Sequence, residues 1–143
     1  MSNLKLARSA IERGKRWLQA GSRAFEDKRW DDVVYSSQMA VEHFVKSVLI
    51  AFGIDFPRVH DVSDILEDVG RRSDVPAWFR EMVPEIAKVM SELAELRGIA
   101  GYGFEEGVDC SYFRDYAPEA LKKARMTLEA CLKLIKELFK TET

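Results

Sequence analysis

The stretch WDDVVYSSQMAVEHFVKSVLIAFG, residues 30–53, decides the fold of this 143-residue chain. Placed on a helix, its apolar side chains cover well over half of the circumference, and a helix of that kind lies in the middle of a bundle. Asp31 or Asp32 is expected to cap its first turn, and Gly53 to end it in a left-handed conformation. The apolar positions are Val33, Ala40, Val41, Phe44, Val45, Val48, Leu49 and Phe52.

Four further helical segments surround this stretch. Apolar residues recur every three to four positions in residues 4–25, in a short segment at 61–69, beyond Pro76, and from about Pro118 to the C-terminus. Pro76 suits the first turn of a helix, whereas Pro84 is expected to kink or interrupt the helix that contains it. No segment alternates with period two, so no strands are expected. The sequence predicts an all-α, antiparallel four-helix up-and-down bundle with one additional short helix.

Length and composition fit one globular domain that spans residues 1–143, with 47% apolar and 32% charged residues. The net charge of −2 is unevenly distributed. Residues 1–30 carry eight Lys/Arg and three Asp/Glu (+5), residues 31–117 eight and seventeen (−9), and residues 118–143 six and four (+2). We expect the basic first helix to pair with the acidic middle of its own fold or of a second subunit, and we predict no DNA partner.

Cysteine content and hydropathy indicate a cytoplasmic protein. Cys110 and Cys131 form no CxxC pair, so both are expected to be free thiols in a reducing compartment. The N-terminus has charges where a signal peptide needs an apolar run. A run of about 18 uncharged apolar residues does not occur, so no membrane span is predicted.

Two motifs resemble the HEPN family of small helical bundles. The central helix of that family reads roughly Q-x-A-x-E-x-x-x-K-x-x-L and ends in glycine, and a loop then leads to a helix that starts with H-D-hydrophobic. The matching residues are Gln38, Ala40, Glu42, Lys46, Leu49 and Gly53, then His60, Asp61, Val62, Ile65 and Leu66. The resemblance implies a homodimer or a partner of a minimal nucleotidyltransferase, often in a toxin–antitoxin pair.

The resemblance also implies a ribonuclease site that needs no metal. In active members, an arginine at the end of the penultimate long helix is followed by four to six residues and then a histidine, and two such motifs face each other across the dimer. Arg97 stands where that arginine belongs, but Tyr102 stands five residues later and no histidine follows. The resemblance therefore implies a degenerate motif, with Arg97 and Tyr102 as its catalytic candidates. It also makes Tyr102 a candidate for modification by the nucleotidyltransferase.

The chemistry of the two candidates favours a structural role over catalysis. Arg97 can hold a phosphate through its forked donors, but tyrosine, with a pKa of about 10, lies roughly 3 units from the optimum for a base at neutral pH. Residues five apart on one helix point about 140° away from each other. The pair can share a site only if the helix ends between them, at Gly98 or Gly101. We expect that ending, with Tyr102 and Phe104 packed over the bundle's end and an acid or ligand beside Arg97.

Gln38, Glu42 and Lys46 lie on successive turns of one helix face and, with His60, are the candidate binding residues. Two interpretations stay open, a functional hydrogen-bonded network and a polar stripe that supports the bundle. EHFVK lacks the second histidine of a zinc-binding HExxH, so no metal is predicted, and GYGFEEG follows a helix, unlike a dinucleotide-binding loop. No cofactor is expected.

Three functions follow from this reading. The first is a dimeric assembly partner of a minimal nucleotidyltransferase with a degenerate ribonuclease motif, and it is the one we expect. The second is an active, metal-independent endoribonuclease toxin that uses Arg97. The third is a nucleotide-binding module. RNA or a nucleotide is the ligand in the second and third.

Overall fold

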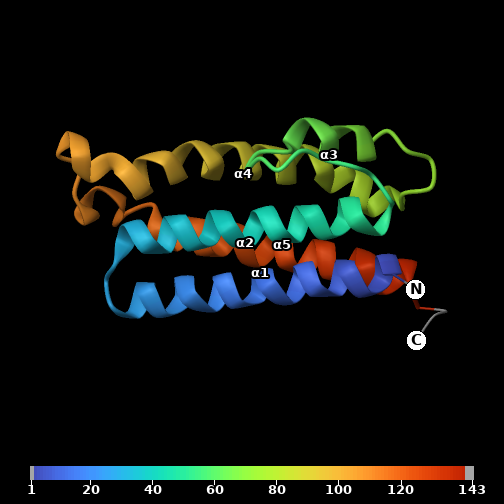
Figure 1. The fold of residues 1–143 in the computed structure, drawn as a ribbon, viewed down its shortest axis with the longest axis horizontal. Helices are drawn as coiled ribbons and strands as arrows, with labels where there is room; N and C mark the ends of the chain where they lie inside the picture. Colours follow the sequence, from blue (N-terminus) through green and yellow to red (C-terminus); the bar gives the residue numbers. More distant parts are fainter. Residues whose placement is uncertain (1, 141–143) are drawn as a thin grey trace.

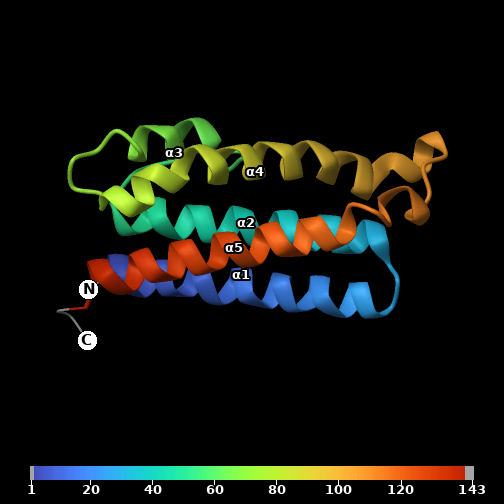
Figure 2. The same cartoon turned by 180° about the vertical axis from the view of Figure 1, so that it is seen from behind.

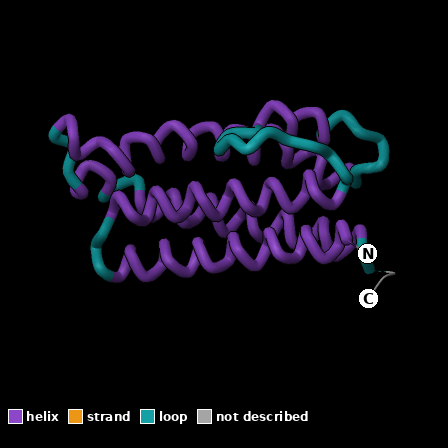
Figure 3. The backbone as a smooth tube through the Cα atoms, viewed as in Figure 1, coloured by secondary structure: helices purple, strands orange, loops and turns teal. Residues whose placement is uncertain are grey.

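The structure is a computed structural model that describes residues 2–140, and its regular elements in that range are all helical (Figure 3). No strand occurs between residues 2 and 140, which confirms the expected all-α class. In chain order, the elements are α1 (Ser2–Glu26), α2 (Trp30–Ala51), α3 (Ser63–Val69), α4 (Ala77–Tyr102), the short 3-10 helices η1 (Gly103–Glu106) and η2 (Cys110–Phe113), and α5 (Ala117–Leu138).

The four long helices run alternately up and down, so each is antiparallel to the next long helix in the chain (Figures 1 and 2). α2 lies in the centre and packs against α1, α4 and α5, while α3 lies on α4. This is the expected four-helix up-and-down bundle with one additional short helix. The central position of α2 follows from its sequence, because apolar side chains around most of its circumference need neighbours on several sides. Its fully buried side chains include Val33, Val34, Ala40, Phe44, Val45, Val48 and Leu49.

Both ends of α2 can be compared with the expectation. Arg29 is the N-cap residue and makes no side-chain cap, but Asp31 Oδ1 accepts a hydrogen bond from the first-turn amide of Asp32 at 2.9 Å, as expected of an aspartate in this turn. Both aspartates lie inside the first turn, where negative charge is favourable. The Asp32 carboxylate pairs with the guanidinium of Arg29 instead. Gly53 has a φ of +68°, which confirms the left-handed stop.

The third long helix, α4, is continuous where the sequence predicts breaks. Pro84 lies inside α4 and does not interrupt it. The lost hydrogen bond and the steric cost of the proline are offset by the burial of neighbouring side chains such as Val83 and Ile86 in the core. Gly98 and Gly101 do not end α4 either, since the helix runs to Tyr102. Leu96 and Ile99 pack against the core, so tertiary contact outweighs the low helix propensity of the glycines.

The basic α1 does not pair with the acidic middle of the same chain. Its one ion pair among the described residues lies within the helix, where Lys15 Nζ is 3.2 Å from Glu12 Oε2. The expectation of an internal pairing was therefore wrong, because α1 meets α2 through buried apolar side chains and keeps its charges on the outside.

Candidate functional site

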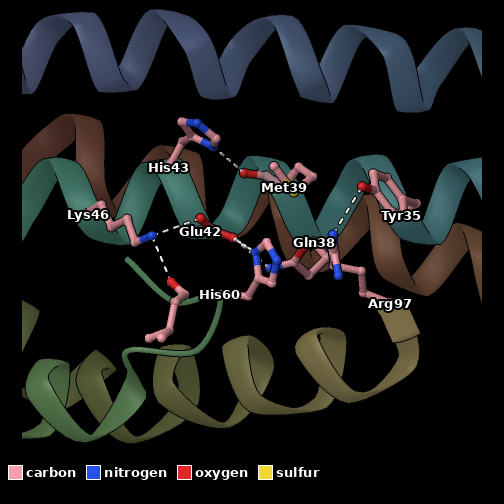
Figure 4. A network of polar contacts seen from close by, with 9 residues as sticks. Tyr35, Gln38, Met39, Glu42, His43, Lys46, His60 and Arg97 are labelled. Atoms are coloured by element: carbon pink, nitrogen blue, oxygen red, sulfur yellow. Dashed lines mark hydrogen bonds and ion pairs between the residues drawn. The ribbon is translucent and has the colours of Figure 1, made fainter. Parts of the chain in front are cut away.

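One face of α2 carries four polar or aromatic side chains toward α4 and toward the loop before α3 (Figure 4). Tyr35, Gln38, Glu42 and Lys46 are spaced by three, four and four residues, so they lie on successive turns of the same face. Gln38 is 1% exposed and Glu42 7% exposed, although both are polar. Buried polar groups are stable only with hydrogen-bond partners, so this face must be satisfied by its neighbours.

Glu42 is the centre of a hydrogen-bonded network. Its Oε1 accepts from Gln38 Nε2 at 3.2 Å and contacts His60 Nδ1 at 2.7 Å, while its Oε2 accepts from Lys46 Nζ at 2.8 Å. The structure thus brings together all four predicted binding residues around one carboxylate (Figure 4).

The network also fixes the charge of Glu42. Burial raises the pKa of the Glu42 carboxyl, but the hydrogen bonds from Lys46, His60 and Gln38, with the charge of Lys46, outweigh burial and leave that pKa below its ordinary value. Glu42 is therefore ionised at neutral pH, and its negative charge is compensated locally.

Lys46 and His60 tie the loop before α3 to the central helix. Lys46 Nζ donates to the carbonyl oxygen of Val59 at 2.8 Å and lies 5.5 Å from the centre of the Phe56 ring. The side chain of His60 is 48% exposed, so one edge of its ring faces Glu42 and the rest of the ring reaches the surface. The polar stripe supports the fold, and it also presents an imidazole at the surface.

Arg97 joins the same face from α4. Its Nη2 donates to the hydroxyl of Tyr35 at 3.1 Å, and its guanidinium carbon lies 4.7 Å from the centre of the Tyr35 ring. Of the expected acid or ligand beside Arg97, the acid is not found among the described residues, because the guanidinium contacts the ring and hydroxyl of Tyr35 instead. Arg97 Nε is buried without a hydrogen-bond partner, as is Gln38 Oε1.

Tyr102 lies away from Arg97. Because α4 is continuous between them, the two side chains point about 140° apart and do not form one site within a single protomer. Tyr102 is 62% exposed and Phe104 71% exposed, so the expectation that they pack over the bundle's end was wrong. The physical reason is that η1 follows α4 directly and directs the chain outward, beyond the end of the other helices (Figure 1).

The chain has two histidines, and both contact acceptors of the bundle. His43 Nδ1 lies 2.7 Å from the carbonyl oxygen of Met39, on the preceding turn of α2. No group of three or more metal-ligating side chains occurs among residues 2–140. Within the same range, no helix has the length and hydropathy that a membrane crossing requires.

Sequence analysis missed Tyr35 as part of this face. A signal for it was present, since Tyr35 precedes Gln38 by three residues and completes the 35–38–42–46 spacing. The contact of Tyr35 with Arg97 joins residues 62 positions apart, and no local pattern reports such a pairing.

Comparisons with known proteins agree with this architecture. A family model described as the HEPN domain matches residues 7–136. A protein of Methanocaldococcus jannaschii that carries the name "Putative toxin MJ1304" is 30% identical over 142 residues, which cover 96% of this chain and 93% of that protein. No solved structure matches the chain at a significant level.

Proposed function

The chain belongs to the HEPN domain family, and from that membership we propose that it is a toxin-like helical module that assembles with a minimal nucleotidyltransferase. The relative from M. jannaschii, similar over nearly the whole length of both chains, carries "toxin" in its name, which supports the toxin-like part of the proposal. Two copies of this chain form the module, and its place of action is the cytoplasm.

The observation that supports the assembly role is a set of three exposed aromatic side chains in the segment that runs from the end of α4 through η2. Tyr102, Phe104 and Tyr112 are 62%, 71% and 64% exposed, and they lie within eleven residues of sequence. Large aromatic side chains are strongly favoured at protein interfaces and are costly to leave in water. This segment is therefore the contact surface for the partner, and the exposed Tyr102 hydroxyl is accessible to modification by it.

The ribonuclease motif is degenerate in this proposal. No histidine follows Arg97, His43 contacts the Met39 carbonyl, and position 102 holds a tyrosine, a residue type that is rarely a general base at neutral pH. The arginine that would stabilise a phosphorane is present, but the proton acceptor that normally follows it is absent from the sequence.

Co-expression tests the assembly role. The chain is produced together with the minimal nucleotidyltransferase encoded beside it, with an affinity tag on the nucleotidyltransferase alone. We expect both chains to co-purify, and we expect Phe104→Ser to reduce the co-purified amount at least tenfold. Leu6→Ser is the matched control, because Leu6 is 54% exposed and lies in the first two turns of α1, outside the segment from Tyr102 to Tyr112. A nucleotidyltransferase that purifies alone contradicts the proposal.

A second candidate function is metal-independent RNA cleavage through Arg97. It is favoured by the half-buried guanidinium that contacts no carboxylate among the described residues. Under this function, pure protein cleaves RNA in the presence of a chelator, and Arg97→Ala abolishes cleavage while helix content is kept. Cleavage that survives Arg97→Ala excludes this function.

A further inference from the structure

A groove of about 560 Å³ runs between α1 and α5, near the end of the bundle where α1 begins and α5 ends (Figures 1 and 2). The apolar residues that line it are Ile11, Leu132, Ile135 and Phe139. Ile11 belongs to the main core, whereas Ile135 and Phe139 belong to a second, smaller apolar cluster. Leu132 is half-buried, so part of this apolar floor is open at the surface.

The shape of the groove suits a helix. Two long helices that pack side by side leave a groove into which the side chains of a third helix can fit. A neighbouring hollow shares Arg8 and Glu12 with the groove and extends along α1 from Leu4 to Arg16, a rise of about 18 Å. That length corresponds to about three turns of a docked helix.

The rim of the groove is basic although the chain is acidic. Four Lys/Arg and one Asp/Glu line the groove, whereas the whole chain carries 22 and 24. The charged lining residues are Arg8, Glu12, Lys15, Lys136 and Lys140. The one carboxylate is paired with Lys15 at 3.2 Å. Within residues 2–140, Arg8 and Lys136 form no ion pair, so their charges complement an acidic partner.

We propose that the groove between α1 and α5 binds an amphipathic helix of another protein, with acidic side chains on both flanks of its apolar face. The apolar face meets the floor at Leu132, and the acidic flanks meet the basic rim at Arg8 and Lys136. This is how amphipathic helices bind apolar grooves in general. No residue of the segment 102–112 lines the groove, so this binding goes beyond the proposed assembly function.

The groove fits a helix better than RNA or a second copy of the chain. Proteins bind single-stranded RNA with aromatic side chains that are exposed for base stacking, but Phe139, the aromatic residue that lines the groove, is only 9% exposed. Two copies that met groove to groove would bring their basic rims together, and like charges at an interface repel. RNA and a second copy are therefore alternative outcomes of the test.

Fluorescence anisotropy of the full chain with three labelled synthetic peptides tests the proposal. Each peptide has about 18 residues, or five helical turns. The first carries leucines on one helical face and glutamates on both flanks, the second has lysines in place of the glutamates, and the third has the composition of the first in an order without an apolar face. We expect saturable binding of the glutamate peptide, at least tenfold tighter than of the other two and weaker in about 0.5 M salt.

Charge reversals locate the binding surface. Arg8→Glu and Lys136→Glu change exposed side chains, so the fold should persist, and each is expected to weaken binding of the glutamate peptide about fivefold or more. Lys122→Glu is the matched control, because Lys122 is an exposed lysine of α5 outside the groove, and its affinity should equal that of wild type.

Several results would overturn the proposal. These are no saturable binding of the glutamate peptide, equal affinities for the glutamate and lysine peptides, or an equal loss of affinity in Lys122→Glu. A single-stranded oligouridine that displaces the bound peptide would assign the groove to RNA. Loss of peptide binding as the chain self-associates at high concentration would assign it to a second copy.

Discussion

His60 Nδ1 and Glu42 Oε1 lie 2.7 Å apart, and this contact joins the loop before α3 to the central helix. The same carboxylate accepts hydrogen bonds from Gln38 and Lys46. A single buried acid on α2 thus positions the loop before α3 and the His60 imidazole. We expect its removal to affect both the stability of the fold and the position of this loop.

Replacement of Glu42 by glutamine tests its structural role. Glu42→Gln keeps the shape of the side chain but leaves the Lys46 ammonium without its carboxylate. We expect the free energy of unfolding to fall by about 1–3 kcal/mol, measured by urea denaturation followed by circular dichroism. Glu85→Gln is the control, because Glu85 is exposed on α4, and its effect should stay within about 0.5 kcal/mol. Equal effects of the two substitutions contradict a central role for Glu42.

The same carboxylate makes stability depend on pH. Since the pKa of Glu42 is below its ordinary value in the folded state, the unfolded chain binds more protons in acid. The contribution of the Glu42 carboxylate to the free energy of unfolding is complete above the pKa of glutamate in the unfolded chain, about 4.3. This contribution is lost as the pH falls through the lower pKa of Glu42 in the folded state. The difference in unfolding free energy between wild type and Glu42→Gln should therefore shrink as the pH falls from about 5 to about 3. A constant difference over that range contradicts the ionised state of Glu42.

Replacement of Gly14 or Gly98 by alanine is expected to have opposite effects on the stability of the fold. A Cβ at Gly14 would lie 2.5 Å from a ring carbon of the fully buried Phe44, so Gly14→Ala forces α1 away from α2 and should destabilise the fold by about 1–3 kcal/mol. A Cβ at Gly98 meets no atom within 4 Å, so Gly98→Ala should stabilise α4 by about 0.5–1 kcal/mol. Thermal unfolding of both variants provides the measurement. A destabilising Gly98→Ala would contradict the continuity of α4 at this position.

The two thiols should differ in reactivity. Cys131 is fully buried in the core, and burial raises the pKa of its thiol far above the usual range. Cys110 is only partly buried, with its sulfur 3.1 Å from the Trp30 amide. We expect a thiol reagent to modify one cysteine per chain in the native state and the second only in denaturant. Rapid modification of both thiols in the native state would contradict the packing of α5.

The arrangement of the helices was predictable because it is decided by the burial of apolar side chains. The apolar pattern of residues 30–53 requires burial on several sides, and the structure places α2 among three other helices. The predicted end of the helix at Gly98 was wrong because the low helix propensity of glycine is only a local preference. Leu96 and Ile99 pack against the core, and this tertiary contact, which the sequence alone does not reveal, stabilises the continuous helix.

The candidate site was predictable only where its residues share one helix. Gln38, Glu42 and Lys46 follow from spacing along α2, and the structure brings His60 to them. The contact between Arg97 and Tyr35 depends on how α4 packs on α2, which spacing within either helix does not report. The outward position of Tyr102 depends likewise on the course of η1.

Calorimetric titration of the purified chain with the purified minimal nucleotidyltransferase encoded beside it tests the central claim most directly. We predict a saturable complex with a Kd in the micromolar range or tighter, at least tenfold weaker for Phe104→Ser and unchanged for Leu6→Ser. No detectable heat of binding under conditions where both proteins are folded, or equal affinities for wild type and Phe104→Ser, would contradict assembly through the segment that follows α4.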